Sequence, residues 1–314
     1  MQTTPPQTPP QNRKDTELTP PQNRKNTELR VDTMQRRFML ALVQLPPSAD
    51  KAAALDRACQ RVREAAQHGA RLVVLPECFN SPYGTQFFET YAETVTPPQR
   101  TFIALSRVAR ESKVYLIGGS FPERKSGKFY NTCLSFSPTG ELLAIHRKLH
   151  LFDINVPGEI SFCESKVLSP GDKLTEFNTE FGRIGVGICY DVRFPEMAQI
   201  AARHGCCAMI YPGAFNLTTG PLHWDLLARA RALDNQMYVA MCSPARDMTA
   251  SYHAYGHSIV VDPNGVVIAQ AGQDEEIVYA HLDIDKIREI RTAIPVTTQR
   301  RFDVYPDVAR LNSI

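Results

Sequence analysis

The stretch GVGICYDVRFPEM, Gly185–Met197, joins an apolar run to the start of a helix. Its proline, Pro195, suits the first turn of a helix, where no backbone N–H is needed for the helical hydrogen bonds. The stretch therefore predicts a strand over Arg183–Ile188, followed by a sharp turn at Cys189. Backbone N–H groups of that turn and the helix N-terminus favour negative charge, which suits a thiolate nucleophile. A cysteine that ends a buried strand is more often a packing residue, so this stretch alone leaves both roles open.

Strands and helices alternate along the rest of the chain. Apolar runs predict further strands over residues 38–45, 71–77, 114–121, 128–137, 141–148, 207–213, 237–243, 256–262 and 266–272. Amphipathic runs predict helices over residues 50–69, 98–112, 195–204 and 222–235. The turns PTG and PNG indicate two hairpins, and residues 149–172 are predicted to be a long loop. The mixture indicates an α/β fold (α+β layered), in which two sheets can pack against each other under helices.

The first 33 residues differ from the rest of the chain. TPPQNRKDTEL (Thr8–Leu18) recurs as TPPQNRKNTEL (Thr19–Leu29) with one change, and the segment offers almost nothing to bury. We therefore predict a disordered tail with an 11-residue repeat over 1–33, without a catalytic role, and one domain over 34–314. Met34 is a candidate for an alternative start of translation, which the sequence alone does not decide.

Composition and charge argue against several classes of protein. The 314 residues include 35 basic and 33 acidic ones, so no basic face for nucleic acid is expected. No apolar run reaches the roughly 18 residues that span a membrane, and no secretory signal is expected at the N-terminus. The expected compartment is the cytoplasm, where the 8 cysteines stay reduced, with a mitochondrial pool as the alternative. The spacing of these cysteines predicts no metal site.

Two further polar residues follow predicted strands. Glu77 comes just after the run RLVVLP, and Lys148 ends the run ELLAIHRK. Each is a weak signal by itself, because single Glu and Lys residues are usually solvated. With Cys189 they place a carboxylate, an ammonium and a thiol at strand ends, where sheet proteins gather their sites. A buried carboxylate can take the thiol proton, and a lysine can stabilise both the thiolate and an oxyanion.

The segments LPECF, HRKLHLFD and GICYDVRFPE resemble the three catalytic segments of the nitrilase superfamily. That family uses a Glu–Lys–Cys triad, and its order matches Glu77, Lys148 and Cys189. The resemblance extends over about residues 37–305 and leaves out the tail. It implies a four-layer α-β-β-α sandwich, assembly into homodimers or larger homo-oligomers, and hydrolysis of carbon-nitrogen bonds without a metal or an organic cofactor.

The resemblance also implies two additions to the triad. A second glutamate of the family lies in the loop after the lysine, and the spacing selects Glu164 over Glu159, which is expected to be solvated. It orients the triad glutamate and the incoming water or amide. The backbone N–H of Tyr190 is expected to hold the oxyanion together with Lys148.

Substrate-binding candidates lie near these segments. Arg193 is a candidate for binding a substrate carboxylate. The alternative, a structural salt bridge between Arg193 and Asp191 or Glu196, is favoured at least equally. Two aromatic residues that follow the Glu and Lys strands, and two threonines of a predicted loop, complete the candidates: Tyr83, Phe152, Thr218 and Thr219.

Within the superfamily, GAFNLTTGPLHW and SPARDMTASYHAYGHS resemble the omega-amidase branch. Its members hydrolyse the terminal amide of α-ketoglutaramate and α-ketosuccinamate, the keto acids left when glutamine and asparagine transaminate. The expected partner is therefore a small amide with a free carboxylate. A deaminated glutathione amidase, a nitrilase and a carbamoylase share the triad and remain alternatives. Outside the superfamily stand a cysteine hydrolase that uses His146 or His150, and a scaffold without catalysis.

Overall fold

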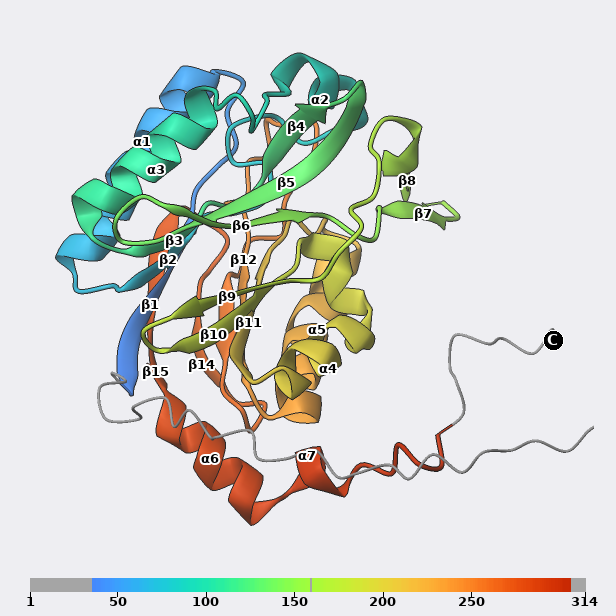
Figure 1. Cartoon of the computed structure of the whole chain (residues 1–314). Helices are drawn as coiled ribbons and strands as arrows, with labels where there is room; N and C mark the ends of the chain where they lie inside the picture. Colours follow the sequence, from blue (N-terminus) through green and yellow to red (C-terminus); the bar gives the residue numbers. More distant parts are fainter. Residues whose placement is uncertain (1–35, 159, 306–314) are drawn as a thin grey trace, which may run out of the picture. The chain divides into compact units, whose positions relative to one another are not determined.

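Two β-sheets form the centre of the fold (Figure 1). The computed structural model describes residues 36–158 and 160–305, so the tail predicted over 1–33 and the side chain of Glu159 lie outside the described part. Seven described strands form the first sheet: β1 (Arg37–Gln44), β2 (Leu72–Val74), β3 (Tyr115–Ile117), β4 (Phe121–Lys125), β5 (Lys128–Phe136), β6 (Leu142–Arg147) and β15 (Glu276–Asp283). Six described strands form the second: β9 (Thr175–Thr179), β10 (Gly182–Val186), β11 (Cys206–Pro212), β12 (Tyr238–Cys242), β13 (Ile259–Val261) and β14 (Val267–Gln270).

The middle of each sheet is parallel. In the first sheet β1, β2 and β3 run in the same direction, and in the second β10, β11 and β12 do so. The strands at the margins pair antiparallel, among them β15 with β1 and β9 with β10. Because parallel strands end at the same edge, residues that follow β2 and β10 are brought to one side of the fold.

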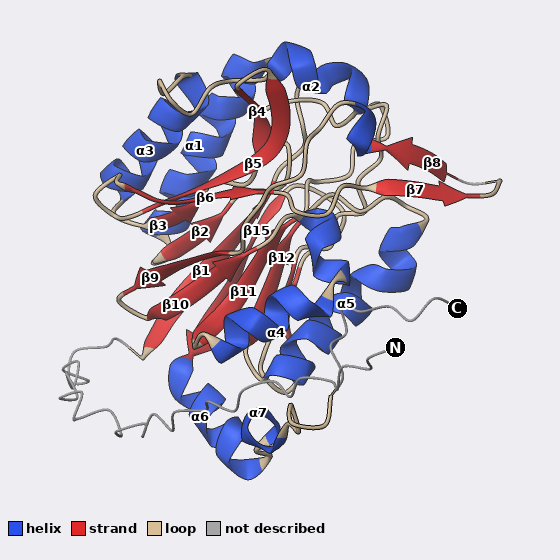
Figure 2. Cartoon of the chain, turned by 45° about the vertical axis from the view of Figure 1, so that its right-hand side comes forward, coloured by secondary structure: helices blue, strands red, loops and turns tan. Residues whose placement is uncertain are grey.

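Helices cover the outer face of each sheet (Figure 2). On the first sheet lie α1 (Lys51–Gln67) and α3 (Arg100–Ser112), and on the second lie α4 (Pro195–Arg203) and α5 (Thr219–Asn235). Three short helices stand at the ends of the strands: α2 (Thr85–Tyr91), α6 (Ile284–Ala293) and α7 (Val296–Gln299). The predicted four-layer α-β-β-α sandwich is therefore confirmed.

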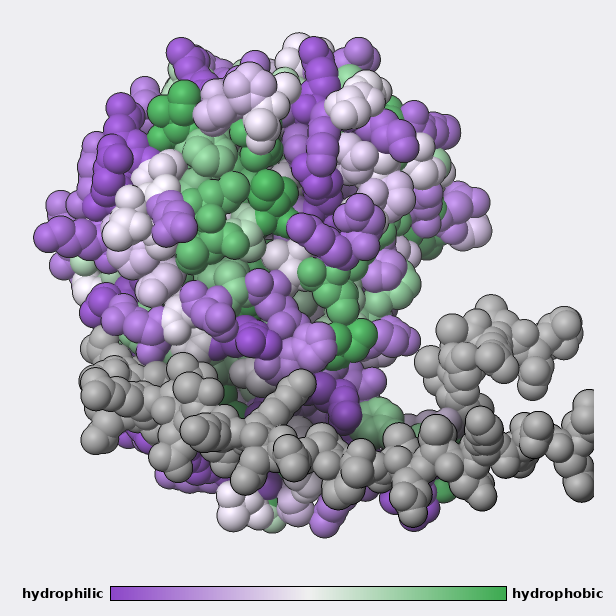
Figure 3. Space-filling view, in the orientation of Figure 1, coloured by the Kyte–Doolittle hydropathy of each residue, from purple (hydrophilic) through white to green (hydrophobic). Residues whose placement is uncertain are grey.

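The apolar core has two large parts, separated by the first sheet, and a smaller third cluster that includes Tyr83 and Phe88. Side chains that alternate along β1 point to opposite faces of that sheet, as the pleat requires. Leu40 and Leu42 pack against the second sheet, with Ile184 and Val239 in the same cluster, whereas Val43 packs under α1 and α3. Burying one such side chain contributes about 1.5–3 kcal/mol, so the inner cluster fixes the spacing of the two sheets. On the face shown in Figure 3, apolar residues gather over the β5–β6 strand pair, whose strand β6 is only half-buried along most of its length.

Several predicted boundaries were wrong, and three of them matter for the site. Residues 149–172 are not one loop, because they contain the hairpin β7 (Asp153–Val156) and β8 (Ile160–Cys163) followed by a 3-10 helix (Glu164–Lys166). Helix α5 begins three residues earlier than predicted, at Thr219. The strand predicted over 114–121 is divided into β3 and β4.

Gly119 explains this division. It has a φ of +62°, and a Cβ at this position would lie 2.2 Å from the backbone oxygen of Pro76. The chain therefore turns out of β3 where it meets the segment that carries Glu77, and only glycine fits there. No described helix is long and apolar enough to span a membrane.

Candidate active site

Four of the predicted side chains meet in one buried cluster at the strand ends. Glu77 follows β2, Lys148 follows β6, Glu164 opens the 3-10 helix after β8, and Cys189 follows β10. Lys148 Nζ lies 3.2 Å from Glu77 Oε1 and 2.9 Å from Glu164 Oε2. The Cys189 thiol lies close enough to the Glu77 carboxylate for each group to shift the pKa of the other. The fold thus brings a thiol, an ammonium and two carboxylates within bonding reach.

Glu77 is held by donors from several segments. Its Oε1 accepts a hydrogen bond from Asn131 Nδ2 on β5 at 2.8 Å, and its Oε2 accepts one from the backbone N–H of Ala214 at 2.8 Å. The residue is only 1% exposed. Because hydrogen bonds fix both oxygens, the carboxylate has one orientation toward the sulfur. The sequence patterns did not reveal Asn131 or Ala214, since one is an ordinary strand residue and the other acts through its backbone.

Glu164 and Lys148 are buried as a pair. Lys148 Nζ donates to both oxygens of Glu164, at 3.0 and 2.9 Å. The same carboxylate accepts from the Tyr83 hydroxyl at 2.8 Å and from the backbone N–H of Phe152 at 2.7 Å. Tyr83 and Phe152 therefore belong to the site, but their polar groups orient Glu164.

The charges of the cluster shift the ionisation of its members. Burial raises the pKa of Glu77 above the usual 4.5; Lys148 lowers that pKa, and Glu164 raises it again. Burial would lower the pKa of Lys148, but Glu164 and Glu77 raise it well above its usual value. Burial and the charge of Glu77 raise the pKa of the Cys189 thiol well above its usual value. These shifts favour a neutral thiol, a charged lysine and a Glu77 carboxylate that binds a proton more readily than an exposed one.

Cys189 lies on a tight turn between β10 and α4. Its φ of +48° is in the left-handed region, which is uncommon for a residue with a side chain, and a 3-10 helix (Cys189–Arg193) follows. Such strain is often found at functional sites. The residue is 3% exposed, so the sulfur is almost enclosed by the surrounding side chains.

Arg193 ends the 3-10 helix of this turn and has no acidic partner among the described residues. Among the ion pairs of the described residues none joins Arg193 to a carboxylate, so the predicted alternative of a salt bridge with Asp191 or Glu196 is wrong. Its guanidinium lies over the rings of Tyr190 and Phe215, at 5.6 and 4.9 Å from their centroids.

Two neighbours hold Arg193 in place, one through its side chain and the other through its backbone. His223 Nδ1 accepts from Arg193 Nη1 at 3.2 Å, and burial and this arginine lower the pKa of His223. Arg231, a buried residue of α5, donates to the backbone oxygens of Val192 and Arg193 at 2.8 and 2.9 Å. Within the described residues, the buried Arg193 Nε has no hydrogen-bond partner, so the guanidinium retains a free donor.

Aromatic rings enclose the cluster. The ring of Tyr83 lies 4.4 Å from that of Tyr252 and 5.7 Å from that of Phe162, and Phe152 lies 5.3 Å from Tyr190. The Tyr252 hydroxyl also donates to the backbone oxygen of Ala214 at 2.5 Å. Sequence reasoning missed Tyr252, although it lies in a segment that carried the family resemblance.

Thr218 and Thr219, which were predicted to lie in a loop and bind substrate, are found at the start of α5. Thr219 is the first residue of α5, and its hydroxyl and N–H both bond to Asn216 Oδ1, at 3.1 and 2.8 Å. Thr218 donates its N–H to the same oxygen at 3.0 Å. Asn216 thus organises the start of α5, and the Thr219 hydroxyl is engaged there instead of in the cluster.

The two histidines beside Lys148 do not serve Cys189. His146 Nε2 lies 3.0 Å from Asp191 Oδ2, and His150 Nδ1 lies 2.8 Å from Asp191 Oδ1. The alternative of a Cys–His pair built from His146 or His150 is therefore wrong. No group of three metal-binding side chains was found in the part of the chain that the structure describes.

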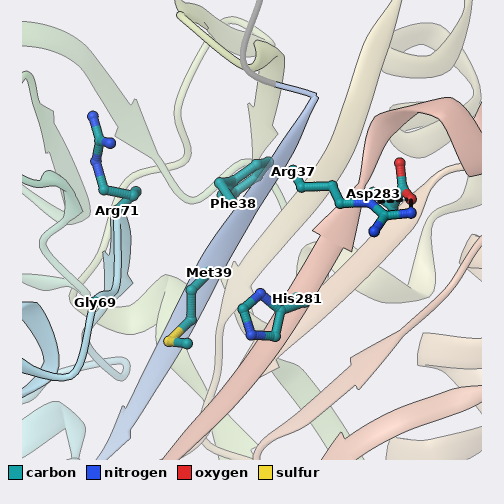
Figure 4. Close-up of a pocket in the computed structure, with 7 residues that line it drawn as sticks. All are labelled: Arg37, Phe38, Met39, Gly69, Arg71, His281 and Asp283. Carbon is teal, nitrogen blue, oxygen red and sulfur yellow. Dashed lines mark hydrogen bonds and ion pairs between the residues drawn. The ribbon is translucent and has the colours of Figure 1, made fainter.

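A cavity of about 740 Å³ lies away from the cluster, on β1 and β15 (Figure 4). It is lined by Arg37, Phe38, Met39, Gly69, Arg71, His281 and Asp283, and includes none of the four cluster residues. Arg37 pairs with Asp283 and Arg71 with Glu180, each at 2.7 Å. Although this cavity is large, we do not assign it as the reactive site, because none of the four cluster residues lines it.

Comparison with known proteins supports the same chemistry. The sequence profile of the carbon-nitrogen hydrolase family matches residues 39–292. Omega-amidase NIT2 of Mus musculus is 59% identical over 268 residues, which cover 85% of this chain and 96% of that protein. Hydrolase C26A3.11 of Schizosaccharomyces pombe is 58% identical over 273 residues, or 87% of this chain and 85% of that protein.

Solved structures agree with the fold. Nit3 of Saccharomyces cerevisiae, described as a member of branch 10 of the nitrilase superfamily, superposes with a TM-score of 0.79 at 50% identity. The match covers 86% of this chain and 98% of that one. The NitFhit protein of C. elegans superposes with a TM-score of 0.76 at 30% identity, over 86% of this chain and 66% of that one. The chain belongs to the carbon-nitrogen hydrolase family of the nitrilase superfamily.

Proposed function

We propose that this enzyme is an omega-amidase that converts α-ketoglutaramate or α-ketosuccinamate and water to the dicarboxylic keto acid and ammonia. The observation that carries the proposal is the buried cluster of Glu77, Lys148, Glu164 and Cys189. The similarity to omega-amidases over most of the chain supports this substrate class. Eight cysteines that are all free thiols support a reducing compartment such as the cytosol, with mitochondria as the alternative.

The first half-reaction forms a thioester. Glu77 takes the thiol proton of Cys189 while the sulfur attacks the amide carbon. The carbonyl oxygen becomes an oxyanion, which Lys148 and the backbone N–H of Tyr190 stabilise. Glu77 returns the proton to the amide nitrogen, the carbon–nitrogen bond breaks, and ammonia leaves.

The second half-reaction uses water. Glu77 takes a proton from the water molecule, whose oxygen attacks the thioester carbon. The carbon–sulfur bond then breaks, the sulfur recovers its proton, and the carboxylic acid leaves. Glu164 holds Lys148 and keeps the incoming water or amide oriented toward Glu77 throughout both steps.

Arg193 supplies the selectivity for a free carboxylate. Its guanidinium is stacked between two aromatic rings and is not neutralised by any described carboxylate within 4 Å. A guanidinium with free donors binds a carboxylate through charge-assisted hydrogen bonds. Tyr190 and Phe215 hold it in place, while Tyr83, Phe152 and Thr218 are proposed to line the remaining wall, and Thr219 to support it through Asn216.

A substrate panel tests the proposed function. Turnover should be fastest for α-ketoglutaramate, and slower by at least about tenfold for deaminated glutathione, a nitrile and a carbamoyl amino acid, because each has a different shape around the reacting carbon. Ammonia release follows three of these reactions, whereas deaminated glutathione releases a dipeptide and is followed by the formation of α-ketoglutarate. Cys189→Ala and Lys148→Ala should each abolish release, because they remove the nucleophile and the oxyanion cation.

Circular dichroism of these two variants supplies the control for folding. Activity that survives Cys189→Ala would refute the thioester mechanism. A nitrile or a carbamoyl amino acid as the best substrate would assign the chain to another activity of the same family.

The Arg193→Gln variant tests carboxylate recognition. KM for α-ketoglutaramate should rise about 10–100-fold, because a charge-assisted hydrogen bond is lost, whereas turnover of pentanamide, which has no carboxylate, should stay within threefold. Arg203→Gln, an exposed arginine of α4, is the matched control and should leave both substrates unaffected. Equal losses for both amides would show that Arg193 does not bind the carboxylate.

The pH profile tests the role of Glu77 as base. A base must be ionised, and the pKa of Glu77 is raised by burial, so kcat/KM should fall with decreasing pH at a midpoint above 4.5. Initial rates between about pH 4 and 8 give this midpoint, with circular dichroism at each pH to exclude unfolding. A midpoint at or below 4.5 in a folded enzyme would contradict the assignment.

We also propose a homodimer in which the two copies pair through α5. Leu222, Leu226 and Leu233 of that helix are 64%, 62% and 55% exposed, an unusual density of apolar surface on one helix. Analytical ultracentrifugation should give a dimer for the wild type, and Leu226→Glu should shift it toward the monomer. Ile103→Glu, at a 55% exposed residue of α3, is the control and should remain dimeric. A wild-type monomer at micromolar concentration would refute the proposal.

A further inference from the structure

Asp191 is a buried carboxylate for which the proposed reaction has no use. It lies two residues after Cys189, in the 3-10 helix of the nucleophile turn, and is 0% exposed. Ionised groups are rarely buried without a specific set of partners, because removing a charge from water is unfavourable. The partners of Asp191 therefore show what it holds together.

All four acceptor positions of this carboxylate are filled. Oδ2 accepts from the backbone N–H of Ile188 at 2.9 Å and lies 3.0 Å from His146 Nε2. Oδ1 accepts from the backbone N–H of His150 at 2.9 Å and from its ring Nδ1 at 2.8 Å. An ionised carboxylate has about four lone-pair sites, so no further partner is needed. Burial would raise the pKa of Asp191, but the hydrogen bonds from His146 and His150 hold it well below its usual value.

The partners come from both sides of the reactive pair. Ile188 precedes the nucleophile, whereas His146 and His150 stand two residues before and two residues after Lys148. One carboxylate thus joins the segment that carries the lysine to the turn that carries the sulfur. These segments belong to different sheets, because β6 is part of the first sheet and β10 of the second.

We propose that Asp191 is a positioning residue that sets the distance between Lys148 and Cys189 by fastening both histidines to the nucleophile turn. The proposal rests on the proposed function, since it assigns Lys148 to the oxyanion and Cys189 to the attack. Asp191 touches neither substrate nor the reacting atoms, and it acts through the backbone that carries them.

The histidines are themselves held on their far sides. His146 is buried, and its Nδ1 lies 3.0 Å from Thr175 Oγ1 on β9. The ring of His150 stacks on that of Phe194, which immediately precedes α4, with centroids 3.6 Å apart and planes 10° apart. Because both histidine rings are held, the Asp191 carboxylate between them has little freedom to move. We therefore expect any displacement of the nucleophile turn to be coupled to a displacement of the segment that carries Lys148.

The Asp191→Asn variant tests this inference. The amide turns one acceptor into a donor that faces N–H groups, so the bridge must open at one end. A shift of about 1 Å in a reactive group lowers the rate about 10²-fold, and we expect kcat for α-ketoglutaramate to fall by that factor while KM stays within threefold. The rate of Cys189 alkylation by iodoacetamide, followed by mass spectrometry, should also change by about tenfold.

Asp262→Asn is the matched control. Asp262, in the turn between β13 and β14, is also a buried aspartate and is 2% exposed. It accepts hydrogen bonds from the N–H groups of Asn264 and Val266 and from the Lys286 side chain. This substitution should lower the melting temperature but leave kcat within threefold. If Asp191→Asn behaved in the same way, its role would be only structural and the proposal would fail.

Two variants of His150 keep the test informative if Asp191→Asn does not fold. The side chain of His150 is 31% exposed, so substitutions there are tolerated better than in the core. Asparagine can present its amide N–H to Asp191 much as the ring Nδ1 does, whereas leucine cannot. We expect His150→Asn to retain kcat within threefold and His150→Leu to lose about tenfold; equal rates in the two variants would overturn the proposal.

The alkylation measurement separates this inference from the proposed function. It needs no substrate, so an altered Cys189 reactivity in Asp191→Asn supports the bridge even if α-ketoglutaramate were a poor substrate. A wild type that is inactive on every omega-amide would instead refute the proposed function alone.

Discussion

The site depends on one lysine held between two carboxylates away from water. Lys148, Glu77 and Glu164 are all 0–1% exposed, and burial of three charges is strongly unfavourable unless each has partners. The fold supplies them: Asn131 and Ala214 for Glu77, and Tyr83 and the backbone of Phe152 for Glu164. The cluster has two carboxyl groups for one ammonium. Burial and the neighbouring Glu164 raise the pKa of Glu77, which favours its acceptance of a proton.

The two-sheet architecture explains how such distant residues meet. Glu77 leaves the first sheet after β2, and Cys189 leaves the second after β10, each in the parallel part of its sheet. The apolar cluster between the sheets fixes their separation, because close-packed side chains resist changes in spacing. The distance between base and nucleophile is therefore determined largely by core packing. Asp191 and its two histidines join the same sheets at a second point.

The sequence predicted those residues of the site that contribute a charged or reactive side chain. Glu77, Lys148 and Cys189 each end an apolar run, and Glu164 follows from the family spacing. Ala214 could not be predicted, because it contributes a backbone N–H that any residue possesses. The hairpin β7–β8 was read as a loop, because its strands are only four residues long and half-exposed. The start of α5 was missed since Asn216, and not a residue at the predicted boundary, organises the first turn.

The enclosure of Cys189 constrains what the enzyme can accept. Cys189 is only 3% exposed, so little of the residue is accessible from solvent. Tyr83 and Tyr252 stand beside the cluster, and their hydroxyls are bonded to Glu164 and Ala214. Displacing Tyr83 would remove a donor to Glu164, and displacing Tyr252 would loosen the Ala214 segment, whose N–H binds Glu77. We therefore expect the hydrogen bonds that hold the buried charges in place also to favour small linear amides.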